Sequence, residues 1–132
     1  MYLPHPVSSP DAPVAVGPYV QAIRHGGVLY CSGSLPLDPA TGKLDNADLA
    51  TETRRSLANL QAVCASVGTH LGNALRMTIF TTRIDGFPEI NEAYASAFST
   101  QVPARTTVGV AALPKGAHVE IDAIVAVPAA DE

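Results

Sequence analysis

Apolar and polar residues alternate along residues 119–127, near the end of the chain. Every odd-numbered position in this segment is apolar, whereas the even-numbered positions hold Glu120, Asp122, Ile124 and Ala126. A period of two indicates a β-strand that has one face in the core. The other face is half apolar, and an uncovered sheet face of this kind favours contact with a partner surface.

Shorter apolar-rich or alternating segments upstream predict four more strands, at residues 19–24, 28–32 and 75–81 and from Arg105 onward. The first two flank His25-Gly26-Gly27 and form a predicted hairpin, because glycine accepts a positive φ at little cost. We interpret Ser32-Gly33-Ser34 as a break that ends the second strand. In the third, alternation from Leu75 to Thr81 predicts that these two residues share one face.

Apolar residues at helical spacing predict two helices. The first covers residues 48–67, with Asp48 as its N-cap and Gly68 just beyond its end. The second starts near Asp85-Gly86 and has Pro88 in its first turn, where a missing N–H is tolerated. One face of this second helix carries Phe87, Ile90, Tyr94 and Phe98.

The order of these elements predicts an α+β fold. Two strands are followed by two helix–strand units and a last strand, and each unit is a crossover long enough to join parallel strands. We therefore expect one domain over residues 1–132, with a mixed sheet covered on one face by two helices. A proline-rich extended arm over residues 1–18 precedes it, and the uncovered sheet face predicts a homo-oligomer whose sheets pack together.

Composition narrows the classes of partner. The chain has 132 residues, 47% of them apolar and 15% charged, with a net charge of −4. This acidic balance argues against binding to a nucleic-acid backbone. Cys31 and Cys64 are expected to be free buried thiols, and four dispersed histidines give a metal site almost no support. Without an apolar signal segment or membrane span, a cytoplasmic location is expected.

Arg105 is the first candidate for chemistry. It follows Pro103-Ala104 at a strand entrance, where a side chain reaches both the interior and an adjoining cleft. Its planar guanidinium keeps its charge and matches a carboxylate through two parallel hydrogen bonds. The alternative is a structural ion pair with one of the chain's twelve acidic residues.

Glu120 is the second candidate. Near a partner subunit it would be partly desolvated, which raises the pKa of a carboxyl group and prepares it for proton transfer. The alternatives are a solvated edge charge or an ion partner for Arg105, and lone acids in strands more often have one of these roles than a catalytic one. Ser32-Gly33 at a strand break offers backbone N–H groups. Asn91 and Tyr94 share a helix face, where a core or interface role is the alternative.

Taken together, these residues resemble one family, the RidA (YjgF) family. The resemblance covers about residues 13–127, and its motifs are Gly17-Pro18-Tyr19, Ser32-Gly33, Asn59-Leu60, Asn91-Glu92-Ala93-Tyr94, Pro103-Ala104-Arg105-Thr106 and Leu113-Pro114-Lys115-Gly116-Ala117-His118-Val119-Glu120-Ile121. It implies a chorismate-mutase-like α+β fold with a six-stranded sheet, and a homotrimer with sheets facing inward and clefts between subunits. It also implies hydrolysis of enamines and imines such as 2-aminoacrylate to keto acids and ammonia, without a cofactor.

The resemblance further implies roles for individual residues. Arg105 would grip the substrate carboxylate, and Glu120 would act on the attacking water. Tyr19, the backbone of Ser32-Gly33 and Asn91 would contact the substrate. Two positions depart from the common pattern, since Ser34 stands where many members have glutamine and Thr107 where some have cysteine. The first leaves the substrate preference open, and the second excludes a thiol mechanism at that position.

Two other functions compete with this hydrolase, a 2-iminobutanoate/2-iminopropanoate deaminase type of enzyme. One is a trimeric binding module for keto or amino acids, or a chaperone-like surface, because a carboxylate clamp serves binding as well as turnover. The other is an endoribonuclease or translation inhibitor, a role also ascribed to members of the family. The net negative charge makes the nucleic-acid role the weakest of the three.

Overall fold

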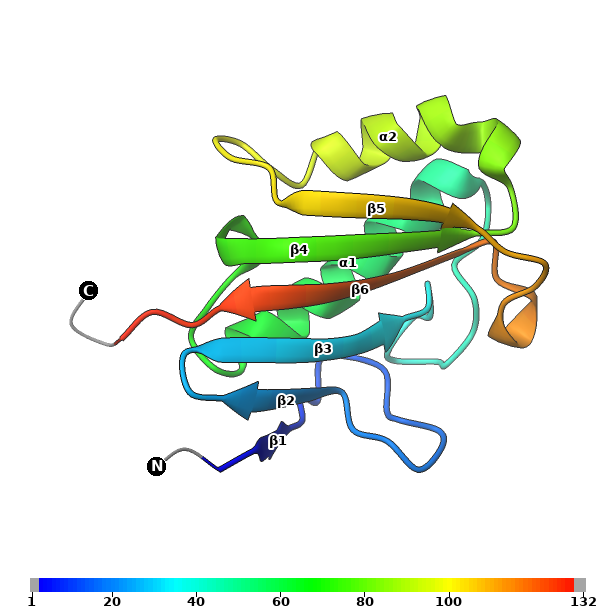
Figure 1. Ribbon diagram of the computed structural model, residues 1–132. Helices are drawn as coiled ribbons and strands as arrows, with labels where there is room; N and C mark the ends of the chain where they lie inside the picture. Colours follow the sequence, from blue (N-terminus) through cyan, green and yellow to red (C-terminus); the bar gives the residue numbers. More distant parts are fainter. Residues whose placement is uncertain (1–2, 130–132) are drawn as a thin grey trace.

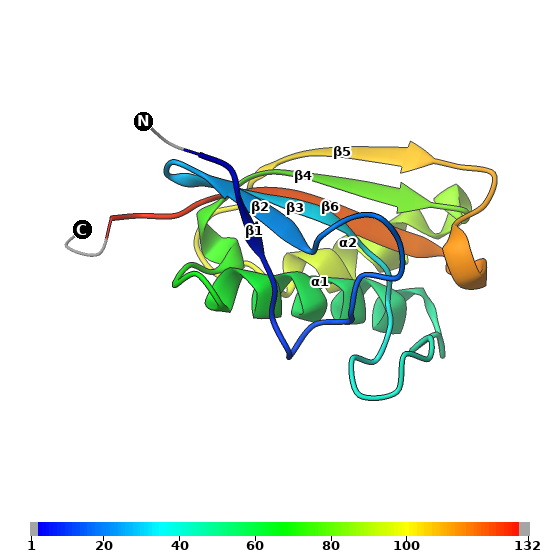
Figure 2. The same ribbon diagram turned by 90° about the horizontal axis from the view of Figure 1, so that it is seen from below.

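The computed structural model describes residues 3–129, which form one six-stranded sheet with two helices packed against the same face (Figures 1 and 2). The strands are β1 (His5–Val7), β2 (Ala22–His25), β3 (Val28–Ser34), β4 (Ala74–Thr81), β5 (Ala104–Gly109) and β6 (Val119–Ala126). The α-helices are α1 (Leu49–Ala65) and α2 (Phe87–Ala95), and three 3₁₀ turns are η1 (Leu71–Asn73), η2 (Ile84–Gly86) and η3 (Pro114–Gly116).

The sheet is mixed, with the order β1-β2-β3-β6-β4-β5. The C-terminal strand β6 lies between β3 and β4 and is antiparallel to both. Strands β4 and β5 are parallel neighbours joined through α2, as the helix–strand order predicts. The predicted α+β arrangement of two helices on one face of a mixed six-stranded sheet is confirmed.

The sixth strand lies in the segment predicted to be an extended arm. His5 pairs with Arg24 and Val7 with Ala22, so that β1 extends the edge of the sheet and buries Val7. A proline suits this position, because Pro6 is in an edge strand. At the other end of the same segment, the predicted strand over residues 19–24 begins only at Ala22.

Two β-bulges change the predicted strand pattern. Ser32-Gly33-Ser34 does not end β3, which continues to Ser34 while its register with β6 shifts after Cys31. A second shift in β4, between Ala74 and Arg76, gives Leu75 no partner in β6. Leu75 is therefore exposed, and the prediction that it shares the buried face of Thr81 is wrong.

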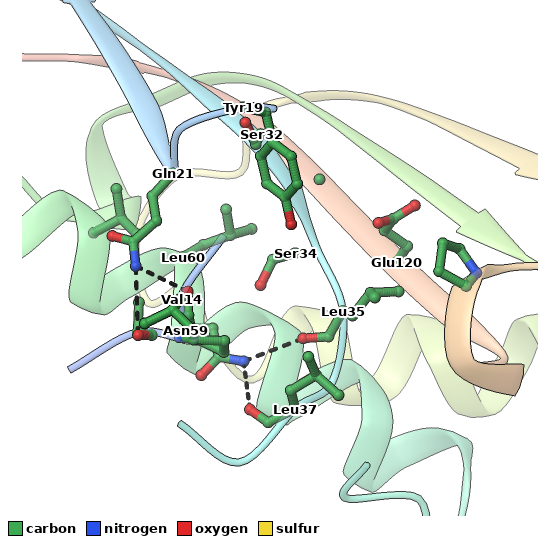
Figure 3. Close-up of a pocket in the computed structure, with 15 residues that line it drawn as sticks. Val14, Tyr19, Gln21, Ser32, Ser34, Leu35, Leu37, Asn59, Leu60 and Glu120 are labelled. Carbon is green, nitrogen blue, oxygen red and sulfur yellow. Dashed lines mark hydrogen bonds between the residues drawn. The ribbon is translucent and has the colours of Figure 1, made fainter. Parts of the chain in front are cut away.

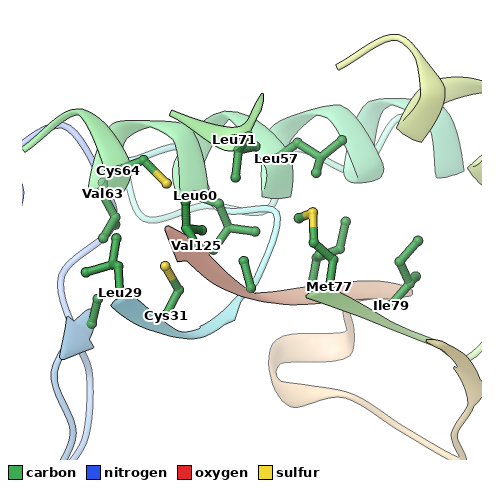
Figure 4. Packing of buried hydrophobic residues seen from close by; sticks show 14 of the residues in the cluster. Leu29, Cys31, Leu57, Leu60, Val63, Cys64, Leu71, Met77, Ile79 and Val125 are labelled. Atoms are coloured by element: carbon green, nitrogen blue, oxygen red, sulfur yellow. The ribbon is translucent and has the colours of Figure 1, made fainter. Parts of the chain in front are cut away.

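The core lies between the sheet and the helices (Figure 4), and β6 supplies its middle. All five odd-numbered residues from 119 to 127 are buried, as their alternation predicts. Helix α1 starts where expected, since the carboxylate of Asp48 accepts a hydrogen bond of 2.7 Å from Thr51 N–H. Helix α2 is shorter than predicted, because it ends at Ala95 and leaves Phe98 in the following segment.

The two cysteines are free and buried, as predicted, although they lie 33 positions apart in the sequence. Cys31 of β3 and Cys64 of α1 meet across the helix–sheet interface (Figure 4). The hydrogen bond that Cys31 donates to Cys64 and its burial both raise the pKa of Cys31, which keeps that group protonated. The pair thus packs as two small apolar side chains.

A buried carboxylate joins α1 to the start of β6. Glu52 is only 1% exposed, and its Oε1 accepts hydrogen bonds from the backbone N–H groups of His118 at 2.8 Å and Val119 at 3.3 Å. Its Oε2 lies 2.8 Å from His118 Nδ1. Two backbone donors directly before Glu120 are thereby held by one carboxylate, so Glu52 fixes the position at which β6 begins.

We expect Glu52→Ala to lower the free energy of unfolding by about 3 kcal/mol or more, because two backbone N–H groups and an imidazole lose a buried partner. Glu52→Gln keeps one oxygen acceptor and should lose less than Glu52→Ala. The measurement is urea unfolding at a fixed protein concentration, with the exposed Glu92→Ala as a control that should change little. Wild-type stability in Glu52→Ala would show that the carboxylate is not a structural link.

Candidate functional site

A cavity of about 390 Å³ opens at the end of β3, between that strand, the segment preceding β2, α1 and the start of β6 (Figure 3). Four of the six predicted site residues line it, namely Tyr19, Ser32, Gly33 and Glu120. Segments far apart in the sequence therefore meet here, and we call these four residues the cleft group. Arg105 and Asn91 are not among the residues that line this cavity.

The bulge in β3 positions the cleft group. Ser32 uses its backbone N–H to bond the carbonyl of Gln21 at 2.9 Å and its hydroxyl to bond the carbonyl of Val20 at 2.6 Å. The prediction that Ser32 offers a free backbone N–H is therefore wrong, because this N–H donates to the carbonyl of Gln21, the residue directly before β2. What these bonds do achieve is to hold the chain after Tyr19 against β3.

Gly33 and the carboxylate of Glu120 are in close contact. A Cβ at position 33 would lie 3.0 Å from both Cδ and Oε2 of Glu120, which is tighter than most contacts of this kind in proteins. A larger residue would therefore have to displace the carboxylate by a few tenths of an ångström, and glycine leaves it in place. Burial, assisted by the charge of Asp122, raises the pKa of Glu120. Within residues 3–129, no protein group donates a hydrogen bond to this carboxylate, so it is available to a water molecule or a ligand.

Two amide side chains, which sequence reasoning did not assign to the site, shape the cavity wall (Figure 3). Gln21 Nε2 donates to the carbonyl of Pro13 at 2.9 Å and so fixes the N-terminal segment. Asn59 is buried in α1, and its Nδ2 donates to the carbonyls of Leu35 at 3.1 Å and Leu37 at 2.8 Å. The sequence signal that could have identified Asn59 is an amide on the buried face of a helix, because such a group needs hydrogen-bond partners.

Arg105 lies at the start of β5 and packs on two aromatic rings of α2. Its guanidinium carbon is 4.8 Å from the ring centre of Tyr94 and 5.6 Å from that of Phe87, within the range of cation–π attraction. In the described part of the chain, no carboxylate forms an ion pair with Arg105. The alternative interpretation of Arg105 as one half of a structural ion pair is therefore wrong within this protomer.

Three buried polar atoms on α2 and β5, the elements that hold this arginine and its aromatic rings, are unpaired. Asn91 is on the same helical face as Phe87 and Tyr94, at positions i, i+4 and i+7, and its Oδ1 is buried without a hydrogen-bond partner. The hydroxyl groups of Tyr94 and Thr107 are also buried and unpartnered. Burial raises the pKa of Tyr94, while the charge of Arg105 acts in the opposite direction. We call Asn91, Tyr94, Arg105 and Thr107 the arginine group.

The cleft group and the arginine group lie on opposite faces of the sheet. Arg105 pairs with Met77 of β4, whose side chain is buried against the helices. Glu120 pairs with Phe80 of β4 and lies between the buried Val119 and Ile121, so it points to the face without helices. One protomer therefore does not bring Arg105 and Glu120 to the same substrate.

Residues 3–129 contain no group of three or more histidine, cysteine, aspartate or glutamate side chains placed to hold a metal ion. Nor is any helix in that range long and apolar enough to cross a membrane.

Comparisons with known proteins place the chain among relatives that it covers almost fully. A family model described as endoribonuclease L-PSP matches residues 9–127. The RutC family protein y4sK of Sinorhizobium fredii is 47% identical over 120 residues, covering 91% of this chain and 95% of that protein. The 2-iminobutanoate/2-iminopropanoate deaminase of Bos taurus is 38% identical over 118 residues, covering 89% and 86%.

Solved structures agree with the sequence relatives. A protein of the conserved Rid protein family from Yersinia pestis, YyfA, is 44% identical, with a TM-score of 0.91 and coverage of 95% of this chain and 100% of that one. TdcF of E. coli, solved with bound serine, is 35% identical, with a TM-score of 0.88 and coverage of 94% and 99%.

The raised pKa of Glu120 leads to a prediction about stability. Because the pKa is higher in the folded than in the unfolded chain, ionisation of Glu120 opposes folding above the folded pKa, and this penalty disappears as pH falls below about 4.3. We expect Glu120→Gln to raise the free energy of unfolding at pH 7 by a few tenths of a kcal/mol, since the group is half exposed and screened.

Urea unfolding at pH 7 and at about pH 4 would measure this difference, which should shrink at the lower pH. Glu92→Gln is the matched control, because Glu92 is exposed on α2 and should give no such pH-dependent gain. A Glu120→Gln variant that is less stable than the wild type at neutral pH would contradict the prediction.

Proposed function

The chain belongs to the RidA family, and we propose that it hydrolyses reactive enamines and imines of the 2-aminoacrylate type to 2-keto acids and ammonia. The observation that carries this proposal is the arginine at position 105, whose guanidinium has no carboxylate partner among the described residues and is held on two aromatic rings. Relatives named 2-iminobutanoate/2-iminopropanoate deaminase, at 36–38% identity, support the reaction class.

Substrate orientation would come from Arg105. A 2-imino acid carries its carboxylate directly beside the electrophilic C=N carbon, so a bidentate contact to the carboxylate fixes the reacting carbon as well. The rings of Phe87 and Tyr94 limit the movement of the guanidinium before substrate arrives. Asn91 Oδ1 and the hydroxyl of Thr107 need hydrogen-bond partners, and an imine or enamine nitrogen and a carboxylate can supply them.

Proton transfer would come from Glu120. The enamine first takes a proton at its terminal carbon and becomes the imine, water then adds to the C=N carbon, and the resulting carbinolamine releases ammonia to leave the keto acid. Each step moves a proton to or from the substrate. A carboxyl group whose pKa is raised by burial is a better proton acceptor and can return the proton in the next step. Tyr19, Ser32 and Gly33 would enclose the substrate on the same side.

A second protomer would complete the site. Since Arg105 and Glu120 point to opposite faces of one sheet, the substrate must bind between the arginine group of one protomer and the cleft group of another. The face without helices is suited to such contact, because Tyr30 is 47% exposed there and Phe80, Val108 and Ile124 lie on the same face. We propose a homotrimer with inward-facing sheets and three equivalent clefts.

Arg105→Ala should reduce the rate of 2-aminoacrylate hydrolysis by about 10²-fold or more, because the loss of a bidentate, charge-assisted contact amounts to a few kcal/mol. The assay generates 2-aminoacrylate enzymatically and follows the loss of its absorbance. Arg105→Lys should recover little, since a single ammonium cannot reproduce the planar fork.

Arg55→Ala is the matched control for this assay, because Arg55 forms an ion pair with Asp45 and does not line the cavity. Arg55 belongs to neither the cleft group nor the arginine group. This variant should hydrolyse 2-aminoacrylate at the wild-type rate. Equal acceleration by wild type and Arg105→Ala would remove Arg105 from the mechanism. If the wild type bound keto acids but hydrolysed no 2-aminoacrylate, a binding module would be favoured instead.

Subunit mixing tests whether the site is shared. Glu120→Gln should bind substrate but turn it over slowly, and Arg105→Ala should be nearly inactive. Trimers co-assembled from equal amounts of these two variants should recover about a quarter of the wild-type activity, because one interface in four joins an intact Arg105 to an intact Glu120. Mixed oligomers that remain as inactive as the separate variants would contradict a site built from two protomers.

A further inference from the structure

A second pocket lies on the helix side of the molecule, away from the cleft group. It has a volume of about 610 Å³ and is formed by one face of α1, the η1 turn and residues 96–101, which follow α2. None of the predicted site residues lines it. In Figure 1 the segment between α2 and β5 leads directly from this region to the start of the strand that carries Arg105.

The pocket has an apolar floor under a polar rim. Leu57 and Leu71 are buried at its base, and Phe98 is partly buried beside them. Ala58 and Ala97 line it with small, exposed side chains, which leaves the space between α1 and residues 96–101 unfilled. A concave site with an apolar base and a polar rim suits a small organic molecule that has both an apolar and a polar part.

The charge of the pocket indicates which small molecule would fit. Its lining includes Arg54 and His70 but no aspartate or glutamate, in a chain with twelve acidic and eight basic residues. Arg54 forms no ion pair with any residue between 3 and 129. The carboxylate that Arg54 influences, Asp48, is engaged with the N–H of Thr51 at the start of α1. An arginine without a bonded acid, above an apolar floor, is complementary to a carboxylate that carries an apolar group.

The pocket is connected to Arg105 by stacked side chains. The ring centres of Phe98 and Tyr94 are 4.9 Å apart, and the guanidinium of Arg105 packs on the ring of Tyr94 at 4.8 Å. The chain supplies a second connection, because Gln101 in the pocket wall is four residues before Arg105. A molecule that packs against Phe98 therefore changes the surroundings of Arg105 without touching it.

We propose that this pocket is a second ligand site, which binds a small organic acid with an apolar body and adjusts the position of Arg105 through Phe98 and Tyr94. The carboxylate binds Arg54, and the apolar body packs on Leu57, Leu71 and Phe98. Binding at this site does not depend on the proposed deamination, because its residues are separate from the cleft group and from the arginine group.

The test uses the full chain with 3-phenylpropanoate as the probe and 3-phenylpropanamide as its uncharged counterpart. NMR follows the backbone amides of Gly72, Ser99 and Gln101, together with the Nε–Hε signal of Arg105. We expect the acid to give saturable shifts in all of these signals, and Arg54→Gln to weaken its binding about tenfold. Arg55→Gln, a change to the neighbouring arginine that is paired with Asp45, should leave the affinity unchanged.

Three further variants distinguish this pocket from the candidate active site. Arg105→Ala should keep the shifts at Gly72 and Ser99, whereas an acid bound at the active site would lose them. Ala58→Phe, an exposed position that does not alter the core, should fill the pocket and abolish binding. Phe98→Leu should still bind the acid but lose the shift of the Arg105 signal, because the ring that connects them is absent.

Four outcomes would overturn the proposal. These are no saturable shift up to about 10 mM acid, equal binding of acid and amide, unchanged affinity in Arg54→Gln, and shifts confined to Gly33 and Tyr19. Should the pocket bind the acid while the Arg105 signal stays constant, the ligand site stands and its coupling to Arg105 is refuted. Failure of the deaminase assay alone changes none of these results.

Discussion

The strict alternation of side chains along β6 is the constraint on which the rest of the structure depends. Its odd-numbered residues are in the core between the sheet and α1, so its even-numbered residues must point to the other face. That requirement places Glu120 and Asp122 beside each other on the uncovered face. A shift of one residue in the register would exchange a buried apolar row for two carboxylates. Glu52 therefore has a role beyond stability, since it fixes the residues directly before this strand.

The two residues best suited to act on a substrate, Arg105 and Glu120, are prepared for this in different ways. Arg105 keeps its charge on aromatic faces, which attract a cation without occupying its hydrogen-bond donors. Glu120 is partly desolvated and has no donor from the described chain, and burial raises the pKa of its carboxyl group. One group is thus ready to bind an anion and the other to exchange a proton. Their location on opposite faces ties any joint action to the assembly of protomers.

Much of the fold was predictable because its signals are local. The period-two pattern of residues 119–127, the capping residue Asp48 and the glycine pair at 26–27 each determine structure through short-range geometry. The bulges in β3 and β4 were not predictable from these patterns, because each depends on how two strands distant in sequence match in register. Leu75 illustrates this, since its apolar character indicates burial but the bulge exposes it.

The sequence indicated four residues that line the cavity, but not the arrangement of all six candidates. The motifs contain Arg105, Glu120, Tyr19 and Gly33, yet nothing in their spacing indicates that Arg105 and Glu120 point apart. The faces follow from pairing each strand with β4, which only the three-dimensional structure supplies. The supporting amides Gln21 and Asn59 were missed for a similar reason, since their hydrogen-bond partners are loop carbonyls.

The burial of both cysteines has a practical consequence. The chain contains no other thiol, and Cys31 and Cys64 meet where α1 covers the sheet. A thiol-reactive dye can reach them only in molecules in which that interface has opened. The labelling rate of the unmodified protein therefore reports how often the helix separates from the sheet, without the need to introduce any probe.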